Sequence, residues 1–202
     1  MEATPRIELG MEVLQTSALP LGYVAFEPSE LDSTFEVARP YSWADVANQP
    51  FLDVMARLPA GVVVISTRVG DQYKGLTASS LVSISLEPPM VLVGLERESA
   101  TRVAILGTKA FNVSLLTRSQ EFIADRFAGR APSIDTKWST LPHRLGANGI
   151  PLVEGCAAWL ECRLVHVHPA GDHDVFIGEV QAATNGRGDP LILWDRAFWS
   201  LH

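Results

Sequence analysis

The feature that most constrains the fold is a run rich in β-branched residues at 62–67 (VVVIST). It follows Pro59 and Gly61, which interrupt regular secondary structure. Such a run is typical of a buried strand. Further strand-like runs occupy residues 73–77, 83–86, 90–95, 111–115, 159–167, 175–182 and 191–194. Only short helices fit between them. The sequence therefore predicts a mostly β fold, an antiparallel barrel with short helical insertions.

Three short helices are expected between these strands. Apolar residues recur at helical spacing over residues 51–58, and the Pro-Ala-Gly segment at 59–61 ends this helix. Ser99 is a favourable N-cap for a helix that reaches Leu106 and closes at Gly107. Thr117 and Gln120 have the spacing of a capping box, and they open a helix that Gly129 ends.

The first quarter of the chain differs in charge from the rest. Residues 1–50 hold eight acids and two bases, a net charge of −6, whereas the whole chain carries −7. We predict an acidic N-terminal arm at residues 1–49, packed on the barrel or on a partner subunit, and one domain at residues 50–202. The acidic balance disfavours nucleic acid as a partner, because phosphate binding needs clustered Lys and Arg.

Several other classes are disfavoured. No apolar run has the length of a membrane span, and the N-terminus lacks the regions of a signal peptide, so we expect a cytoplasmic protein without a membrane partner. Cys156 and Cys162 are too few for a disulfide scaffold and are expected to be reduced and buried. Even spacing would place Cys162, His166 and His168 on one strand face, but the spacing is not that of a closed zinc site, and no metal is predicted.

Three segments carry groups suited to ligand binding. Residues 75–93 form a strand, a small hydroxyl-rich turn and a return strand, and small side chains let backbone N–H groups approach a ligand. Residues 96–102 (ERESATR) combine a helix start with two hydroxyls and two arginines, a natural anion cradle. His173 lies between Asp172 and Asp174, which can orient it. Taken singly, the segments also fit an ordinary turn, a capped surface helix and an exposed turn histidine.

The order of these segments resembles the flavin reductase family, whose members have the FMN-binding split-barrel fold and serve as reductase components of two-component flavin-dependent monooxygenases. The resemblance runs from about residue 51 to residue 201. It rests on GLTASS at 75–80 with Ser83, Ser85 and Pro88-Pro89, FNV at 111–113, RFAG at 126–129, GDH at 171–173 before FIGEV at 176–180, and Pro190-Leu191. Ser79 stands where many relatives have Asn.

The resemblance implies an antiparallel Greek-key split β-barrel, generally a homodimer with the flavin near the subunit interface. Its turn at residues 77–80 would line the flavin ring and ribityl chain, Ser99 and Thr101 would meet the phosphate, and Phe127 would pack near the flavin. The implied cofactor-binding set is Thr77, Ala78, Ser79, Ser80, Ser83, Arg97, Ser99, Thr101, Arg126 and Phe127. His173 would position the nicotinamide.

The implied activity is that of an NAD(P)H:flavin oxidoreductase that passes reduced flavin to a transient partner monooxygenase. FMN and FAD both remain open as the flavin, and NADH and NADPH as the hydride donor. Two alternatives keep the same fold. One is a non-catalytic flavin-binding or electron-transfer protein, and the other is a flavin-retaining oxidase or nitroreductase. His173 favours the enzyme, because a carrier needs no group on the nicotinamide side.

Overall fold

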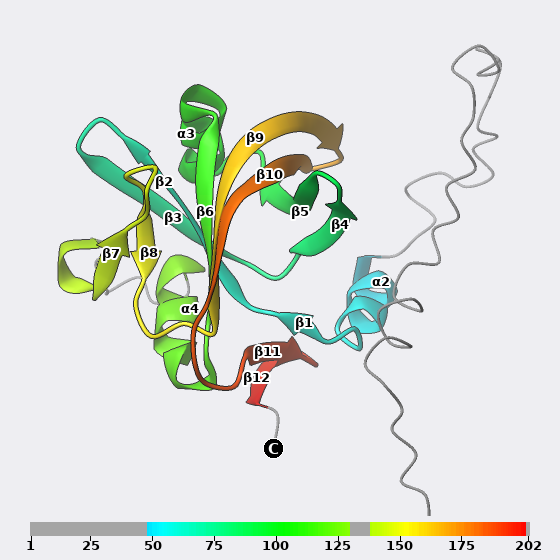
Figure 1. Ribbon diagram of the computed structural model, residues 1–202. Coiled ribbons are helices and arrows are strands. Elements are labelled where there is room, and N and C mark those ends of the chain that lie inside the picture. The colour runs from blue at the N-terminus through cyan, green and yellow to red at the C-terminus, as the bar shows by residue number, and fades with distance from the viewer. Residues whose placement is uncertain (1–47, 130–137, 201–202) are drawn as a thin grey trace, which may run out of the picture. The chain divides into compact units, whose positions relative to one another are not determined.

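The computed structural model describes residues 48–129 and 138–200 (Figure 1). Nearly all of the predicted acidic arm, residues 1–49, lies outside this part of the chain, and its packing stays a prediction. Within the described part, no helix is both long and apolar enough to cross a membrane. Cys156 and Cys162 are free and buried, as expected.

The strands of the described residues form three antiparallel sheets. The largest has seven strands in the order β3-β2-β6-β9-β10-β5-β4, and a three-stranded sheet β1-β11-β12 and a pair β7-β8 accompany it. The bounds are β1 (Ala60–Gly61), β2 (Val63–Val69), β3 (Gln72–Ala78), β4 (Val82–Leu86), β5 (Pro89–Glu96), β6 (Ala110–Leu115), β7 (His143–Leu145), β8 (Pro151–Val153), β9 (Ala158–Ala170), β10 (His173–Asn185), β11 (Leu191–Trp194) and β12 (Ala197–Ser200). The predicted mostly β, antiparallel class is confirmed. Sequence reasoning missed the short strands β1, β7, β8 and β12.

The β-branched run becomes β2, and it is buried on both faces. Val63 and Ile65 belong to the core cluster that also holds Phe111 and Phe176. Val62, just before the strand, and Val64 pack into a second cluster on the opposite side. A strand covered on both faces has no polar side to alternate with, which explains the uninterrupted apolar run.

Within residues 48–129 and 138–200, three α-helices accompany the strands: α2 (Asn48–Met55), α3 (Ala100–Thr108) and α4 (Glu121–Phe127), the last preceded by the 3-10 helix Arg118–Gln120. The predicted N-cap Ser99 is confirmed, but closure at Gly107 was wrong. The helix continues to Thr108 and ends at Lys109, whose φ of 58° is left-handed. The apolar side chains of residues 51–58 form no buried face, and Phe51, Val54 and Leu58 are all exposed.

The strands β9 and β10 form a long, curved antiparallel ribbon (Figure 1). Its register shifts where Ile177 pairs with His166 but Gly178 pairs with Leu164, so Val165 is an extra residue. A bulge of this kind reverses the side-chain alternation. The expected shared face of Cys162, His166 and His168 was therefore wrong, because Cys162 is buried and both histidines are exposed. Among the described residues, no group of three potential metal ligands occurs.

Candidate functional site

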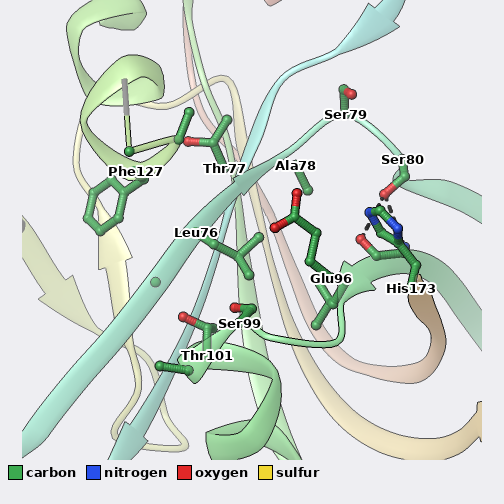
Figure 2. Close-up of a pocket in the computed structure, with 16 residues that line it drawn as sticks. Leu76, Thr77, Ala78, Ser79, Ser80, Glu96, Ser99, Thr101, Phe127 and His173 are labelled. Carbon is green, nitrogen blue, oxygen red and sulfur yellow. Dashed lines mark hydrogen bonds between the residues drawn. The ribbon is translucent and has the colours of Figure 1, made fainter. Parts of the chain in front are cut away.

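A cavity of about 560 Å³ lies where the end of β3, the start of α3, the end of α4 and the start of β10 meet (Figure 2). Its size is within the usual range for small-molecule sites. Eight of the residues predicted from the sequence line it: Thr77, Ala78, Ser79, Ser80, Ser99, Thr101, Phe127 and His173. The fold thus brings the three predicted ligand segments to one place.

The hydroxyl-rich turn is fixed by its own side chains. The Thr77 hydroxyl donates to the carbonyl of Ala124 at 2.7 Å, which holds α4 against β3. The Ser80 hydroxyl accepts from the Gly94 N–H at 3.0 Å and donates to the Gly94 carbonyl at 3.1 Å. The turn is therefore attached to α4 on one side and to β5 on the other. It forms a preorganised wall of the cavity.

Glycine at position 75 allows aromatic rings to lie directly against β3. A Cβ there would come within 2.9 Å of Phe127 Cε1 and 3.0 Å of Trp138 Cζ2, closer than atoms in proteins pack. The Phe127 and Trp138 rings lie with centroids 5.1 Å apart. The cavity consequently has an apolar, aromatic border next to its hydroxyl-rich wall, an arrangement suited to a flat ring that carries a polar chain.

The start of α3 supplies the anion-binding side. The Ser99 side chain accepts from the Arg102 N–H and caps the helix, and Thr101 is buried in the first turn. Free N–H groups and the helix dipole both favour a negative group at such a position. The cavity thus joins an aromatic border to a site suited to a phosphate.

His173 borders the cavity from the start of β10. Its Nδ1 is 2.8 Å from Asp172 Oδ1. An ionised carboxylate only accepts, so Nδ1 is the donor in this contact. The hydrogen bond from His173 lowers the pKa of the exposed Asp172 carboxyl. The contact thus orients a ring that borders the cavity.

Three predicted residues do not line the cavity. Ser83 lies on β4, exposed and opposite Val91. Arg126 is buried, and its Nη2 donates to Thr140 Oγ1 at 2.6 Å. Arg97 lies beside the cavity rather than in it, and its Nε donates to Asp174 Oδ1 at 3.1 Å. Within the described part of the chain, these three residues therefore lie outside the cavity lining.

Sequence reasoning missed Glu96 and Gly94, which both line the cavity. The Glu96 side chain projects from the end of β5 into the cavity, as Figure 2 shows. No motif signals a carboxylate in the cavity, although Glu96 is the first residue of the segment 96–102 predicted to bind an anion. Gly94 has a clearer signal, because it is the one glycine in an otherwise apolar strand.

A second hollow of about 740 Å³ adjoins the first. The two share Gly75, Ala100, Thr101 and Phe127 as lining residues. Aromatic side chains from Tyr73, Trp138 and His143 border the second hollow. The two hollows therefore lie next to each other at the start of α3.

Comparisons with known proteins agree with this site. The Flavin reductase like domain matches residues 55–202. The reductase component of 4-hydroxyphenylacetate 3-monooxygenase from Thermus thermophilus is 34% identical over 76% of this chain and 96% of that protein. An NADH-dependent flavin reductase from a Rhodococcus species is 33% identical over 73% of this chain and 82% of that protein.

A solved structure extends the likeness to three dimensions. The Streptomyces globisporus NADH:FAD oxidoreductase in complex with NAD and FAD fragments superposes with a TM-score of 0.70 and 30% identity, over 77% of this chain and 93% of that one. The antiparallel sheet is thus the split barrel that the motif order predicts. Together with the domain match over most of its length, this shows that the chain belongs to the flavin reductase family.

Proposed function

We propose that this protein is an NAD(P)H:flavin oxidoreductase that supplies reduced FMN or FAD to a partner flavin-dependent monooxygenase. The observation that carries the proposal is the single cavity in which the hydroxyl-rich turn, the start of α3 and His173 meet. Named relatives with the same fold are NADH-dependent flavin reductases. NADH is therefore the donor to test first, and NADPH the second.

The two ligands would supply the chemistry of such a reaction, the transfer of a hydride from nicotinamide to flavin. The protein binds and orients them. The turn at residues 77–80 and the Phe127 ring hold the flat ring system, and the first turn of α3 with Ser99 and Thr101 binds the phosphate. His173, oriented by Asp172, borders the same cavity and would position the nicotinamide.

Both FMN and FAD are proposed as candidates for the flavin. The second hollow adjoins the first at Gly75 and Phe127, which leaves space for the larger of the two. FMN would use the first cavity and the start of α3. The adenosine part of FAD has the second, aromatic hollow available. Titrating the protein with each flavin, and following flavin fluorescence, ranks the two.

We also propose a homodimer as the assembly. The edge strand β4 exposes the apolar side chains of Val82, Ile84 and Leu86, with 52%, 37% and 72% of their surface accessible. A sheet edge that exposes apolar side chains offers a surface on which a second copy of the chain can pair. Light scattering that gives twice the chain mass supports this assembly. The cytoplasmic location stays a prediction.

Steady-state turnover separates the proposal from its two alternatives. Protein mixed with NADH and free flavin should consume NADH in proportion to protein concentration. A flavin carrier would bind flavin without consuming NADH. A flavin-retaining oxidase or nitroreductase would turn over without added free flavin and would keep a tightly bound one through purification.

A further inference from the structure

Next to the proposed flavin site, one buried carboxylate joins two arginines across two chain segments. Asp174 on β10 has a side chain only 5% exposed. Arg97 Nε donates to its Oδ1 at 3.1 Å. Arg102 donates to its Oδ2 from Nε at 2.7 Å and also from Nη2. Both oxygens of the carboxylate are therefore used by charged donors.

The arginines belong to the segment that carries the anion-binding side of the cavity. Arg97 comes directly after β5, and Arg102 lies in the first turn of α3. Between them lie Ser99, which caps the helix, and Thr101. A backbone hydrogen bond from the Arg97 N–H to the Asp172 carbonyl, 3.0 Å long, adds a further link to the turn before β10.

The same carboxylate is also close to the nicotinamide side. Asp174 directly follows His173, and His173 pairs with Glu96 across the two strands. Successive residues of a strand point to opposite faces. His173 therefore borders the cavity while Asp174 points behind it, toward the two arginines. The start of β10 thus carries both the histidine on the nicotinamide side and the carboxylate that binds the arginines of the phosphate side.

Asp174 remains ionised at neutral pH. The hydrogen bond from Arg102 lowers the pKa of this carboxyl, opposed by its burial and assisted by Arg97. Removing one partner of a buried ion pair leaves the charge of the other partner uncompensated. The charged cluster therefore joins the start of β10 to the segment that leads into α3.

We propose, resting on the function proposed above, that Asp174 is a positioning residue for phosphate recognition. By clamping Arg97 and Arg102, it holds the first turn of α3 in place relative to the strand that carries His173. The clamp keeps the phosphate-binding N–H groups and the nicotinamide-positioning histidine at one fixed spacing. Asp174 itself lies outside the cavity lining and touches neither ligand.

The test compares two flavins that differ only in the phosphate. Riboflavin has the same ring and ribityl chain as FMN but no phosphate, so it does not use the first turn of α3. Asp174→Asn should weaken FMN binding about tenfold, as expected for the loss of charge-assisted hydrogen bonds. Riboflavin binding should stay within about twofold of the unmodified protein. The matched control is Glu179→Gln on the same strand as Asp174, which breaks the ion pair between Glu179 and Arg163 of β9 and should change neither affinity.

A second variant keeps the test decisive if Asp174→Asn does not fold. Arg102→Lys preserves the positive charge but cannot make the two-pronged contact with Asp174. It should also lose FMN affinity selectively. Equal losses of FMN and riboflavin affinity in both variants, or unchanged FMN affinity, would overturn the inference. If the unmodified protein binds neither flavin, the proposed function fails first, and the inference fails with it.

Discussion

At the scale of single residues, His173 is the side chain whose chemical role is most specific. Replacing it with Ala should slow hydride transfer or raise the KM for NADH several-fold, because one useful hydrogen bond contributes about 0.5–1.5 kcal/mol. Flavin affinity should change less. Stopped-flow reduction of bound flavin at several NADH concentrations measures the rate of hydride transfer and its dependence on NADH. His168→Ala, an exposed histidine on β9, is the control. Traces identical to those of the unmodified protein would make His173 a turn residue only.

Glu96 gives a second prediction at this scale, because its carboxylate projects into a cavity proposed to bind a phosphate. Like charges a few ångströms apart repel by about 1 kcal/mol in water. Glu96→Gln should therefore tighten FMN binding several-fold, with little effect on riboflavin. The gain should shrink at high salt, since salt screens the repulsion. Glu98→Gln, an exposed neighbour outside the cavity lining, should leave FMN affinity unchanged. An equal effect on both flavins would contradict this electrostatic account.

At the scale of elements, α4 depends on the capping box that precedes it. The Thr117 N–H donates to Gln120 Oε1 at 2.9 Å, and Gln120 Nε2 donates to the Glu154 carbonyl at 2.7 Å. The Cys156 thiol also donates to Gln120 Oε1 at 3.3 Å, and burial raises the pKa of that thiol to about 12, so it stays protonated. Gln120→Ala should lower the free energy of unfolding by about 1–3 kcal/mol, because buried groups lose their partners.

Denaturant unfolding measures this loss, with Glu121→Gln, a change at the exposed first residue of α4, as the control. An unchanged transition midpoint for Gln120→Ala would show that water replaces the amide without cost. A midpoint lowered equally by the control would point to general helix weakening instead.

The elements also show where sequence reasoning succeeds and where it stops. The β-branched run predicts β2 because a strand buried on both faces must be apolar throughout. The bulge at Val165 leaves no mark in composition, since one extra residue changes the pairing and not the residue types. Gly107 fails as a helix end because Lys109 takes the left-handed conformation instead. The turn at residues 77–80 and His173 follow from motif order, whereas Glu96 and the clamp around Asp174 depend on segments far apart in the chain.

At the scale of the whole molecule, the free energy of unfolding should depend on pH in the acid range through Asp172 and Asp174. The pKa of each carboxyl is lowered in the folded state, by His173 for Asp172 and chiefly by Arg102 for Asp174. Unfolded Asp titrates near pH 4, so the unfolded chain binds more protons below that pH. The free energy of unfolding should be fully retained above about pH 5 and fall as pH drops through 4 and below. Asp174→Asn should be less stable at neutral pH and show a shallower acid-side loss. Parallel pH curves would contradict this assignment.

The most direct test of the central claim is an anaerobic mixture of protein, NADH and excess free flavin. The account predicts that nicotinamide and flavin absorbance fall together, with one NADH oxidised per flavin reduced and many flavins turned over per protein. Repeating it with FMN, FAD and NADPH identifies the preferred pair. If the protein binds flavin but oxidises neither NADH nor NADPH faster than a protein-free mixture does, the protein is not a flavin reductase and the account is wrong.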